Sequence, residues 1–109
     1  MTVSVIALVT INEDEPVALA RYMQTTEPLL EKANAKIVSR FVVNEVVVGH
    51  RPAKMIVIVE YPNRAAVASV FESEEYRELI PIRDAAFLDY QVTIATDTEQ
   101  PHELPIGMS

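Results

Sequence analysis

The hydrophobic positions along the chain follow two different periods, which distinguish strands from helices. Apolar runs rich in β-branched residues predict strands at residues 3–11, 36–48, 55–61 and 89–96. Apolar positions three and four residues apart predict two helical regions, one after the acidic stretch that ends at Pro16 and one after Asn63. The predicted order of elements is therefore β-α-β-β-α-β.

Capping and helix-breaking residues refine these boundaries. Asn63 and Ser73 carry side chains that suit helix N-termini, so we expect one helix to begin after Asn63 and a further helical turn after Ser73. Pro28 lies within the first helical region and is expected to kink or interrupt it, because proline lacks a backbone donor and clashes with the preceding turn. We assign residues 1–97 to one domain and residues 98–109 to a polar C-terminal tail.

The β-α-β-β-α-β order predicts an α+β fold of ferredoxin-like type, a four-stranded antiparallel sheet with the helices on one face. The other face also needs cover, because the strands at 3–11 and 55–61 carry apolar residues at both odd and even positions. Large bare apolar patches are uncommon on soluble monomers. We therefore expect a homodimer in which two sheets pack face to face. Apolar faces that line a ligand cavity are a compatible alternative.

Composition and charge limit the classes of partner. The chain has 109 residues, enough for one domain, and half of them are hydrophobic, which argues against disorder. Its net charge of −7 disfavours nucleic acid and anionic membrane surfaces. No apolar run approaches the roughly 18 residues of a membrane span. From the charge and the lack of such a run together, we expect neither a nucleic-acid nor a membrane partner. The absence of cysteine excludes disulfides and thiol catalysis and fits a cytoplasmic location.

The histidines offer little metal or acid–base chemistry. His50 lies in a predicted turn and His102 in the predicted tail, and neither belongs to a pair with metal-ligand spacing. We therefore predict no bound metal and no cofactor, haem included. His50 could act as a general base near neutral pH, although turn histidines are more often simply solvated.

Three linked motifs occur in the second half of the chain. They are Glu60-Tyr61-Pro62-Asn63, Phe71-Glu72-Ser73-Glu74-Glu75-Tyr76 and Leu79-Ile80-Pro81-Ile82-Arg83. In these motifs the chain resembles domain-of-unknown-function family 1330 of the dimeric α/β-barrel superfamily. It departs from that pattern at Asn34-Ala35 and at Val70, where members often carry glycines and an aromatic residue. The resemblance implies a ferredoxin-like dimeric α/β barrel but no particular chemistry, because a fold alone does not define a function.

The motif region also supplies candidates for a ligand site. Tyr76 could present its hydroxyl at the mouth of a pocket, and Arg83 could hold a carboxylate through paired hydrogen bonds. The structural alternative is that Tyr76 packs in the core and Arg83 pairs with Glu75 or Glu78. Tyr22 lies on the apolar stripe of the first helix, where aromatic residues usually belong to the core. The predicted ligand-binding residues are Tyr76, Arg83, His50 and Tyr22, and no catalytic residue is assigned.

Two functions stay open at this level. One is a dimeric module that binds or senses a small organic molecule, or that acts as a scaffold, without turnover. The other is a cofactor-independent monooxygenase or isomerase that acts on a small aromatic or anionic substrate. The enzyme would be favoured by a closed pocket of at least ~300 Å³ that two or more of His50, Tyr76 and Arg83 reach. A filled interior would favour the binding or scaffold module. Arg40, in mid-strand, could face solvent, a partner or a bound anion.

Overall fold

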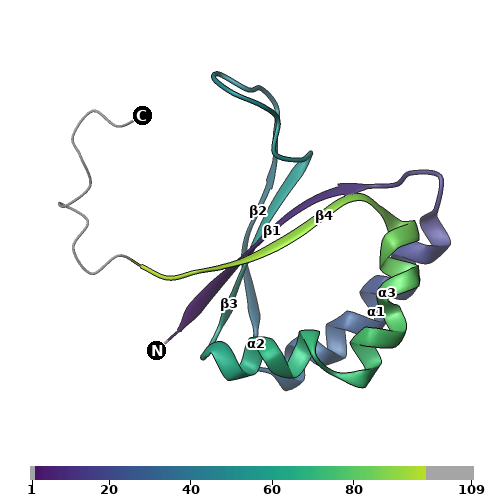
Figure 1. Ribbon diagram of the computed structural model, residues 1–109, viewed down its shortest axis with the longest axis vertical. Helices are drawn as coiled ribbons and strands as arrows, with labels where there is room; N and C mark the ends of the chain where they lie inside the picture. Colours follow the sequence, from purple (N-terminus) through teal and green to yellow (C-terminus); the bar gives the residue numbers. More distant parts are fainter. Residues whose placement is uncertain (1, 98–109) are drawn as a thin grey trace.

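A four-stranded antiparallel sheet carries three helices on one face in the computed structural model, which describes residues 2–97 (Figure 1). The elements are β1 (Val3–Ile11), α1 (Pro16–Lys32), β2 (Lys36–Val42), β3 (Met55–Tyr61), α2 (Arg64–Phe71), α3 (Glu74–Ala86) and β4 (Phe87–Ala95). The strand order is β2-β3-β1-β4, with every neighbouring pair antiparallel. The predicted ferredoxin-like fold is confirmed, while the tail predicted at residues 98–109 lies outside the described residues.

The helix boundaries follow local capping signals. The Oδ1 atom of Asn63 accepts a hydrogen bond from the Ala66 N–H at 2.8 Å, and the Oγ atom of Ser73 accepts one from the Tyr76 N–H at 3.1 Å. These two caps begin α2 and α3, so the second helical region is divided at Ser73 as expected. The predicted interruption at Pro28 does not occur, because α1 continues through it to its end. One lost backbone hydrogen bond is outweighed by the packing of the helix on both sides of the proline.

Two strands differ from their predicted ranges. β2 ends at Val42 instead of residue 48, and the N–H of Val43 then donates to the carbonyl of Lys54 at 2.8 Å before the chain leaves the sheet. The intervening loop projects beyond the sheet (Figure 1). β4 begins at Phe87, two residues earlier than predicted, because the chain passes from α3 into the strand without a loop. The predicted number and order of strands are unaffected.

Both faces of the sheet carry apolar side chains, as the sequence pattern predicts. Toward the helices, β1 and β3 present residues such as Val5, Val9 and Val59, which are buried. The opposite face, called the outer face below, has an apolar centre. Its apolar residues are Ile6, Leu8, Phe41, Ile56 and Ile58, which are half-buried except for the more exposed Phe41.

The hydrophobic core lies between the helices and the inner side of the sheet. Its buried members are Val3, Val5, Tyr22, Ala33, Val59, Tyr61, Val67, Val70, Tyr76 and Leu79. Each fully buried aliphatic side chain of this kind contributes roughly 1.5–3 kcal/mol to folding. Within residues 2–97, no helix has the length and apolar character that a membrane crossing requires.

Candidate functional site

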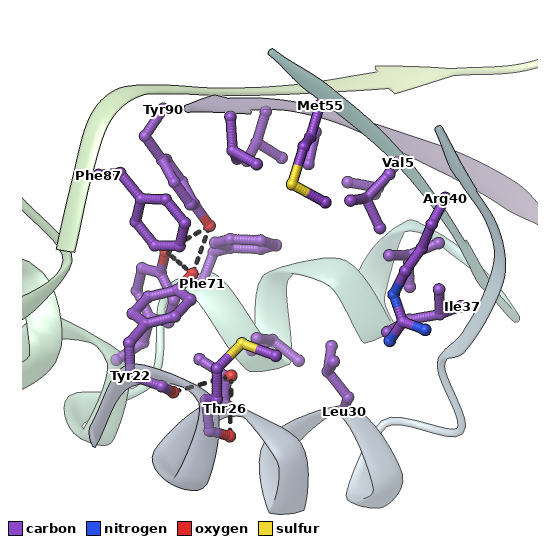
Figure 2. Close-up of a pocket in the computed structure, with 18 of the residues that line it drawn as sticks. Val5, Tyr22, Thr26, Leu30, Ile37, Arg40, Met55, Phe71, Phe87 and Tyr90 are labelled. Atoms are coloured by element: carbon purple, nitrogen blue, oxygen red, sulfur yellow. Dashed lines mark hydrogen bonds between the residues drawn. The ribbon is translucent and has the colours of Figure 1, made fainter. Parts of the chain in front are cut away.

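An apolar cavity of about 240 Å³ lies between the sheet and the helices and is partly open to solvent (Figure 2). Its walls come from all four strands and from α1, α2 and α3. They include Val5, Ala7, Val9, Leu30, Met55, Val57 and Val92. The volume is below the roughly 300–1,000 Å³ of drug-sized sites. It exceeds the roughly 150 Å³ of an engineered protein cavity that binds benzene. The space therefore suits a molecule with one ring and a short substituent.

All four tyrosines of the chain line this cavity. The hydroxyls of Tyr22 on α1, Tyr76 on α3 and Tyr90 on β4 form a closed set of hydrogen bonds, which we call the tyrosine triangle (Figure 2). The Tyr76 hydroxyl oxygen lies 3.0 Å from each of the other two, which also bond to each other. The triangle thus joins three elements that are far apart in the sequence.

Local structure holds each corner of the triangle in place. Tyr76 lies in the first turn of α3, directly after the Ser73 cap. The Oγ1 atom of Thr26 donates to the carbonyl of Tyr22 at 2.9 Å, one turn along α1. Tyr90 lies opposite Val9 on the inner side of the sheet. The ring of Tyr22 meets the rings of Tyr76 and Tyr90 edge to face, with centroids 6.2 and 5.9 Å apart. Such contacts stabilise aromatic clusters beyond simple burial.

Tyr22, Tyr61 and Tyr90 are neutral over the physiological pH range. Burial raises the pKa of Tyr22 and of Tyr90 well above the usual value; Tyr90 and Tyr76 raise that of Tyr22 further, and Tyr76 raises that of Tyr90 further. Burial and the nearby Tyr76 raise the pKa of Tyr61 to about 12. These phenols can donate and accept hydrogen bonds, but they are poorly suited to act as bases at neutral pH.

The fourth tyrosine, Tyr61, stands apart from the triangle. Its side chain is only 1% exposed, yet among the described residues its hydroxyl has no hydrogen-bond partner. No fully buried side-chain polar atom in residues 2–97 lacks a partner. Tyr61 is thus the one tyrosine of the cavity wall that stands outside the triangle.

The structure places two of the four predicted ligand-binding residues, Tyr22 and Tyr76, in the wall of the cavity. Arg83 lies behind the triangle, with its guanidinium carbon 5.0 Å from the ring centre of Tyr90 and 5.9 Å from that of Tyr76. Cations at this distance from an aromatic face are attracted to it. The guanidinium also forms a 3.3 Å salt bridge with Asp84. The structural alternative considered from the sequence had paired Arg83 with Glu75 or Glu78 instead. Arg83 thus supports the triangle without lining the cavity.

The predicted candidate His50 is not brought to this site. It is exposed in the loop between β2 and β3. No histidine, aspartate or glutamate of the described chain lines the cavity. Residues 2–97 also contain no cluster of three or more side chains that could hold a metal ion. The expected absence of a metal and a cofactor stays a prediction.

Three residues of the cavity wall were missed as site candidates or left undecided by sequence reasoning: Tyr90, Tyr61 and Arg40. A signal for Tyr90 was present, because it alternates with Val92 and Ile94 on one side of β4. Arg40 reaches the inner side through a β-bulge at Val38, which the sequence pattern does not reveal. The cavity is neither filled nor a closed space above 300 Å³, so it meets neither of the two conditions set from the sequence.

Solved structures share this fold at low sequence identity. One is RPA0582, a protein of unknown function from Rhodopseudomonas palustris, with a TM-score of 0.74, 22% identity and coverage of 90% of this chain and 83% of that chain. A dimeric protein of unknown function and ferredoxin-like fold from Bacteroides fragilis has a TM-score of 0.54, 16% identity and coverage of 88% and 96%. An antibiotic biosynthesis monooxygenase has a TM-score of 0.53, 23% identity and coverage of 88% and 98%. These similarities establish the fold alone.

A search of the curated proteins finds no match to this chain. The family model described as Domain of unknown function (DUF1330) matches residues 2–96, nearly the whole of the described domain. The matched range includes the three motifs between Glu60 and Arg83 that suggested this family from the sequence. The chain therefore belongs to the DUF1330 family.

Proposed function

We propose that this protein binds a small, mainly apolar organic molecule in the cavity between its sheet and its helices. The observation that supports this proposal best is the tyrosine triangle within a mainly apolar wall. Ligand sites typically combine apolar walls with a few convergent polar groups that orient the ligand. Binding without turnover is favoured because no carboxylate or histidine of the described chain lines the cavity. Of the tyrosines that do line it, Tyr22, Tyr61 and Tyr90 are held neutral by burial.

A titration with toluene, followed by the backbone amide signals in NMR, tests the proposal. We expect saturable shifts at cavity residues such as Val9, Leu30 and Met55. The variant Ala7→Phe should abolish them, because the new ring occupies the space that Ala7 lines. Ala20→Phe is the matched control, since Ala20 is exposed on α1 outside the cavity. If toluene causes no saturable shifts, or if Ala7→Phe leaves them unchanged, the proposal is wrong.

A second candidate function is a cofactor-independent monooxygenase or isomerase. It is favoured by the fold shared with the antibiotic biosynthesis monooxygenase, at 23% identity. Oxygen uptake with hydroquinone as a readily oxidised probe separates the monooxygenase from simple binding. Uptake above the protein-free rate that falls in a Tyr76→Phe variant would support the enzyme.

We also propose that the protein works as a homodimer through the outer face. The apolar centre of that face includes Phe41, whose side chain is 52% exposed in the single chain. A second copy would cover it and continue the two-layer architecture on the other side of the sheet. Light scattering should give a mass near twice 12.2 kDa, and a monomer would contradict the proposal. A cytoplasmic location and the lack of nucleic-acid and membrane partners stay predictions from composition.

A further inference from the structure

The hydrogens of the tyrosine triangle determine which ligand groups it can receive. A neutral phenol has one hydrogen to donate and two lone pairs that accept. The three hydrogens of the triangle are used in its three internal hydrogen bonds, so its oxygens can accept a further hydrogen bond but have no hydrogen left to donate. A ligand group that meets the closed triangle must therefore bring its own hydrogen. An ether, carbonyl or carboxylate oxygen would find no donor there, at a cost of roughly ten- to hundredfold in affinity.

The hydroxyl of Tyr61 has the opposite requirement. Tyr61 lines the cavity and its hydroxyl forms no hydrogen bond with another described residue, so we take its hydrogen as the one that is donated to a ligand. It lies near enough to Tyr76 for the two side chains to influence each other electrostatically. A ligand hydroxyl can donate to the triangle and accept from Tyr61 at the same time. An ammonium group could donate but has no lone pair to accept, so a hydroxyl suits this end of the cavity better.

The other end of the cavity carries a positive charge. Arg40 is the one charged side chain of the described chain in the cavity wall, and it takes part in no ion pair within residues 2–97. Figure 2 shows its guanidinium directed toward the cavity, on the side away from the Tyr90 hydroxyl. The bulge at Val38 is responsible, because it places Arg40 opposite Val57 on the inner side of the sheet. In an unbulged strand the alternation would turn Arg40 to the outer face.

A guanidinium in this position can bind a carboxylate through two parallel hydrogen bonds. Arg40 lies on the exposed edge strand, so the carboxylate would stay partly hydrated and would not bear the full cost of leaving water. The other nearby cation, Arg83, is already paired with Asp84 and lies outside the cavity wall. A carboxylate is therefore expected at the Arg40 end and not at the triangle.

We infer that the ligand is a hydroxy acid built on a single ring. Its hydroxyl donates to the tyrosine triangle and accepts from Tyr61, and its carboxylate pairs with Arg40 at the cavity mouth. The ring occupies the apolar middle, whose volume of about 240 Å³ admits one ring with short substituents. This inference depends on the proposed ligand-binding function and names the class of ligand for the same cavity.

Calorimetric titration of the full chain with four related compounds tests the inference. The hydroxy acid is 4-hydroxyphenylacetate. Phenylacetate lacks the hydroxyl, 4-methoxyphenylacetate keeps an oxygen that cannot donate, and 4-hydroxyphenylacetamide lacks the carboxylate. We expect the hydroxy acid to bind at least about tenfold more tightly than each of the others, the effect of one unsatisfied or lost charged hydrogen bond. Equal affinity for either of the two acids without a donor hydroxyl overturns the role of the triangle, and equal affinity for the amide overturns the role of Arg40.

Two variants separate the two ends of the site. Tyr90→Phe leaves two hydroxyls with two hydrogens and one mutual hydrogen bond, so one hydrogen becomes free to donate. The preference for the hydroxyl over the methoxy compound should then fall by about tenfold. Arg40→Gln should remove the preference for the acid over the amide and leave the hydroxyl preference intact. Lys36→Gln is its matched control, because Lys36 is also exposed on β2 but lies outside the cavity wall.

The outcomes also distinguish this inference from the proposed function. If toluene occupies the cavity but the hydroxy acid has no advantage over its analogues, the hydroxy-acid inference is wrong and the binding function stands. If neither toluene nor any of the four compounds binds, the binding function itself is wrong. Because Arg40 is exposed, its variant is expected to fold even if a substitution within the triangle does not.

Discussion

Raising the pH above 10 is expected to unfold the protein, because its buried tyrosines keep their protons longer than the unfolded chain does. In the unfolded chain each tyrosine ionises near its ordinary pKa of about 10. In the folded protein the pKa of Tyr61 is raised to about 12, and those of Tyr22 and Tyr90 are also raised. The folded state therefore holds more protons than the unfolded state above pH 10. Stability is complete below that pH and is lost as the pH rises toward the folded values.

The size of the loss follows from the pKa difference. One pKa unit corresponds to about 1.4 kcal/mol, so Tyr61 alone lowers the free energy of unfolding by roughly 3 kcal/mol in all as the pH rises from well below 10 to well above 12. Burial raises the pKa of Tyr22 and of Tyr90 as well, so both add to this loss in the same direction. Tyr61 alone thus removes a large share of the whole stability of a small domain, which is about 5–15 kcal/mol.

Urea unfolding followed by circular dichroism at successive pH values measures this loss directly. The free energy of unfolding should stay level to about pH 9 and then fall by up to about 4 kcal/mol for each pH unit once Tyr22, Tyr61 and Tyr90 are all ionised in the unfolded chain. In a Tyr61→Phe variant the loss of stability per pH unit should be smaller than in the unchanged protein, and the difference between the two slopes should be about 1.4 kcal/mol per pH unit. Ionisation of Tyr22, Tyr61 and Tyr90 near pH 10 while the protein is still folded, followed by tyrosinate absorbance, would refute the reasoning, since it would mean that their hydroxyls are not shielded from water.

Three further substitutions test single contacts. Tyr76→Phe removes two hydrogen bonds of the triangle and should lower the free energy of unfolding by about 1–3 kcal/mol in urea; an unchanged value would mean that the hydroxyls are satisfied by water. Ser73→Ala removes the cap of α3 and should cost about 1 kcal/mol in the same assay, and no loss would contradict the capping geometry. Ile58→Lys places a charge at the centre of the outer face and should shift the mass in light scattering from dimer to monomer, whereas Glu60→Lys, at an exposed position near the end of the same strand, should not. A stable Ile58→Lys dimer would place the interface elsewhere.

Much of the fold could be predicted from the sequence because its signals are local. The apolar residues at both odd and even positions of β1 and β3 indicate that both faces of the sheet are apolar. Asn63 and Ser73 begin helices through bonds to residues three positions away. Pro28 does not interrupt α1, because packing along the helix outweighs that part of the local rule, while the alternative of a kink at Pro28 stays a prediction. The β-bulge at Val38 was out of reach as well, since strand register depends on the partner strand and not on the period of one segment.

The candidate site could be predicted only in part. Tyr22 and Tyr76 were selected separately, each for a different reason, while their contact joins residues 54 positions apart. No sequence pattern indicates that Tyr90 completes the set, because three elements must pack before the hydroxyls meet. Arg83 was selected for a role in holding a carboxylate, and its contact with Asp84 and the tyrosine rings gives it a supporting place instead. His50 was selected because histidine suits acid–base chemistry, but it lies exposed in a loop away from the cavity wall. The type of a residue does not indicate the direction in which its loop projects.

The closed triangle of hydroxyls has a consequence for how the domain responds to a bound molecule. Its three O–H bonds can point around the ring in either of two senses, and a reversal requires all three hydrogens to turn together. Hydrogen bonds in such a ring polarise one another, so a donor that arrives at one corner changes the strength of the other two. Each corner belongs to a different element, namely α1, α3 and β4. Contact with a single tyrosine is therefore transmitted at once to both sides of the cavity, the helices and the sheet.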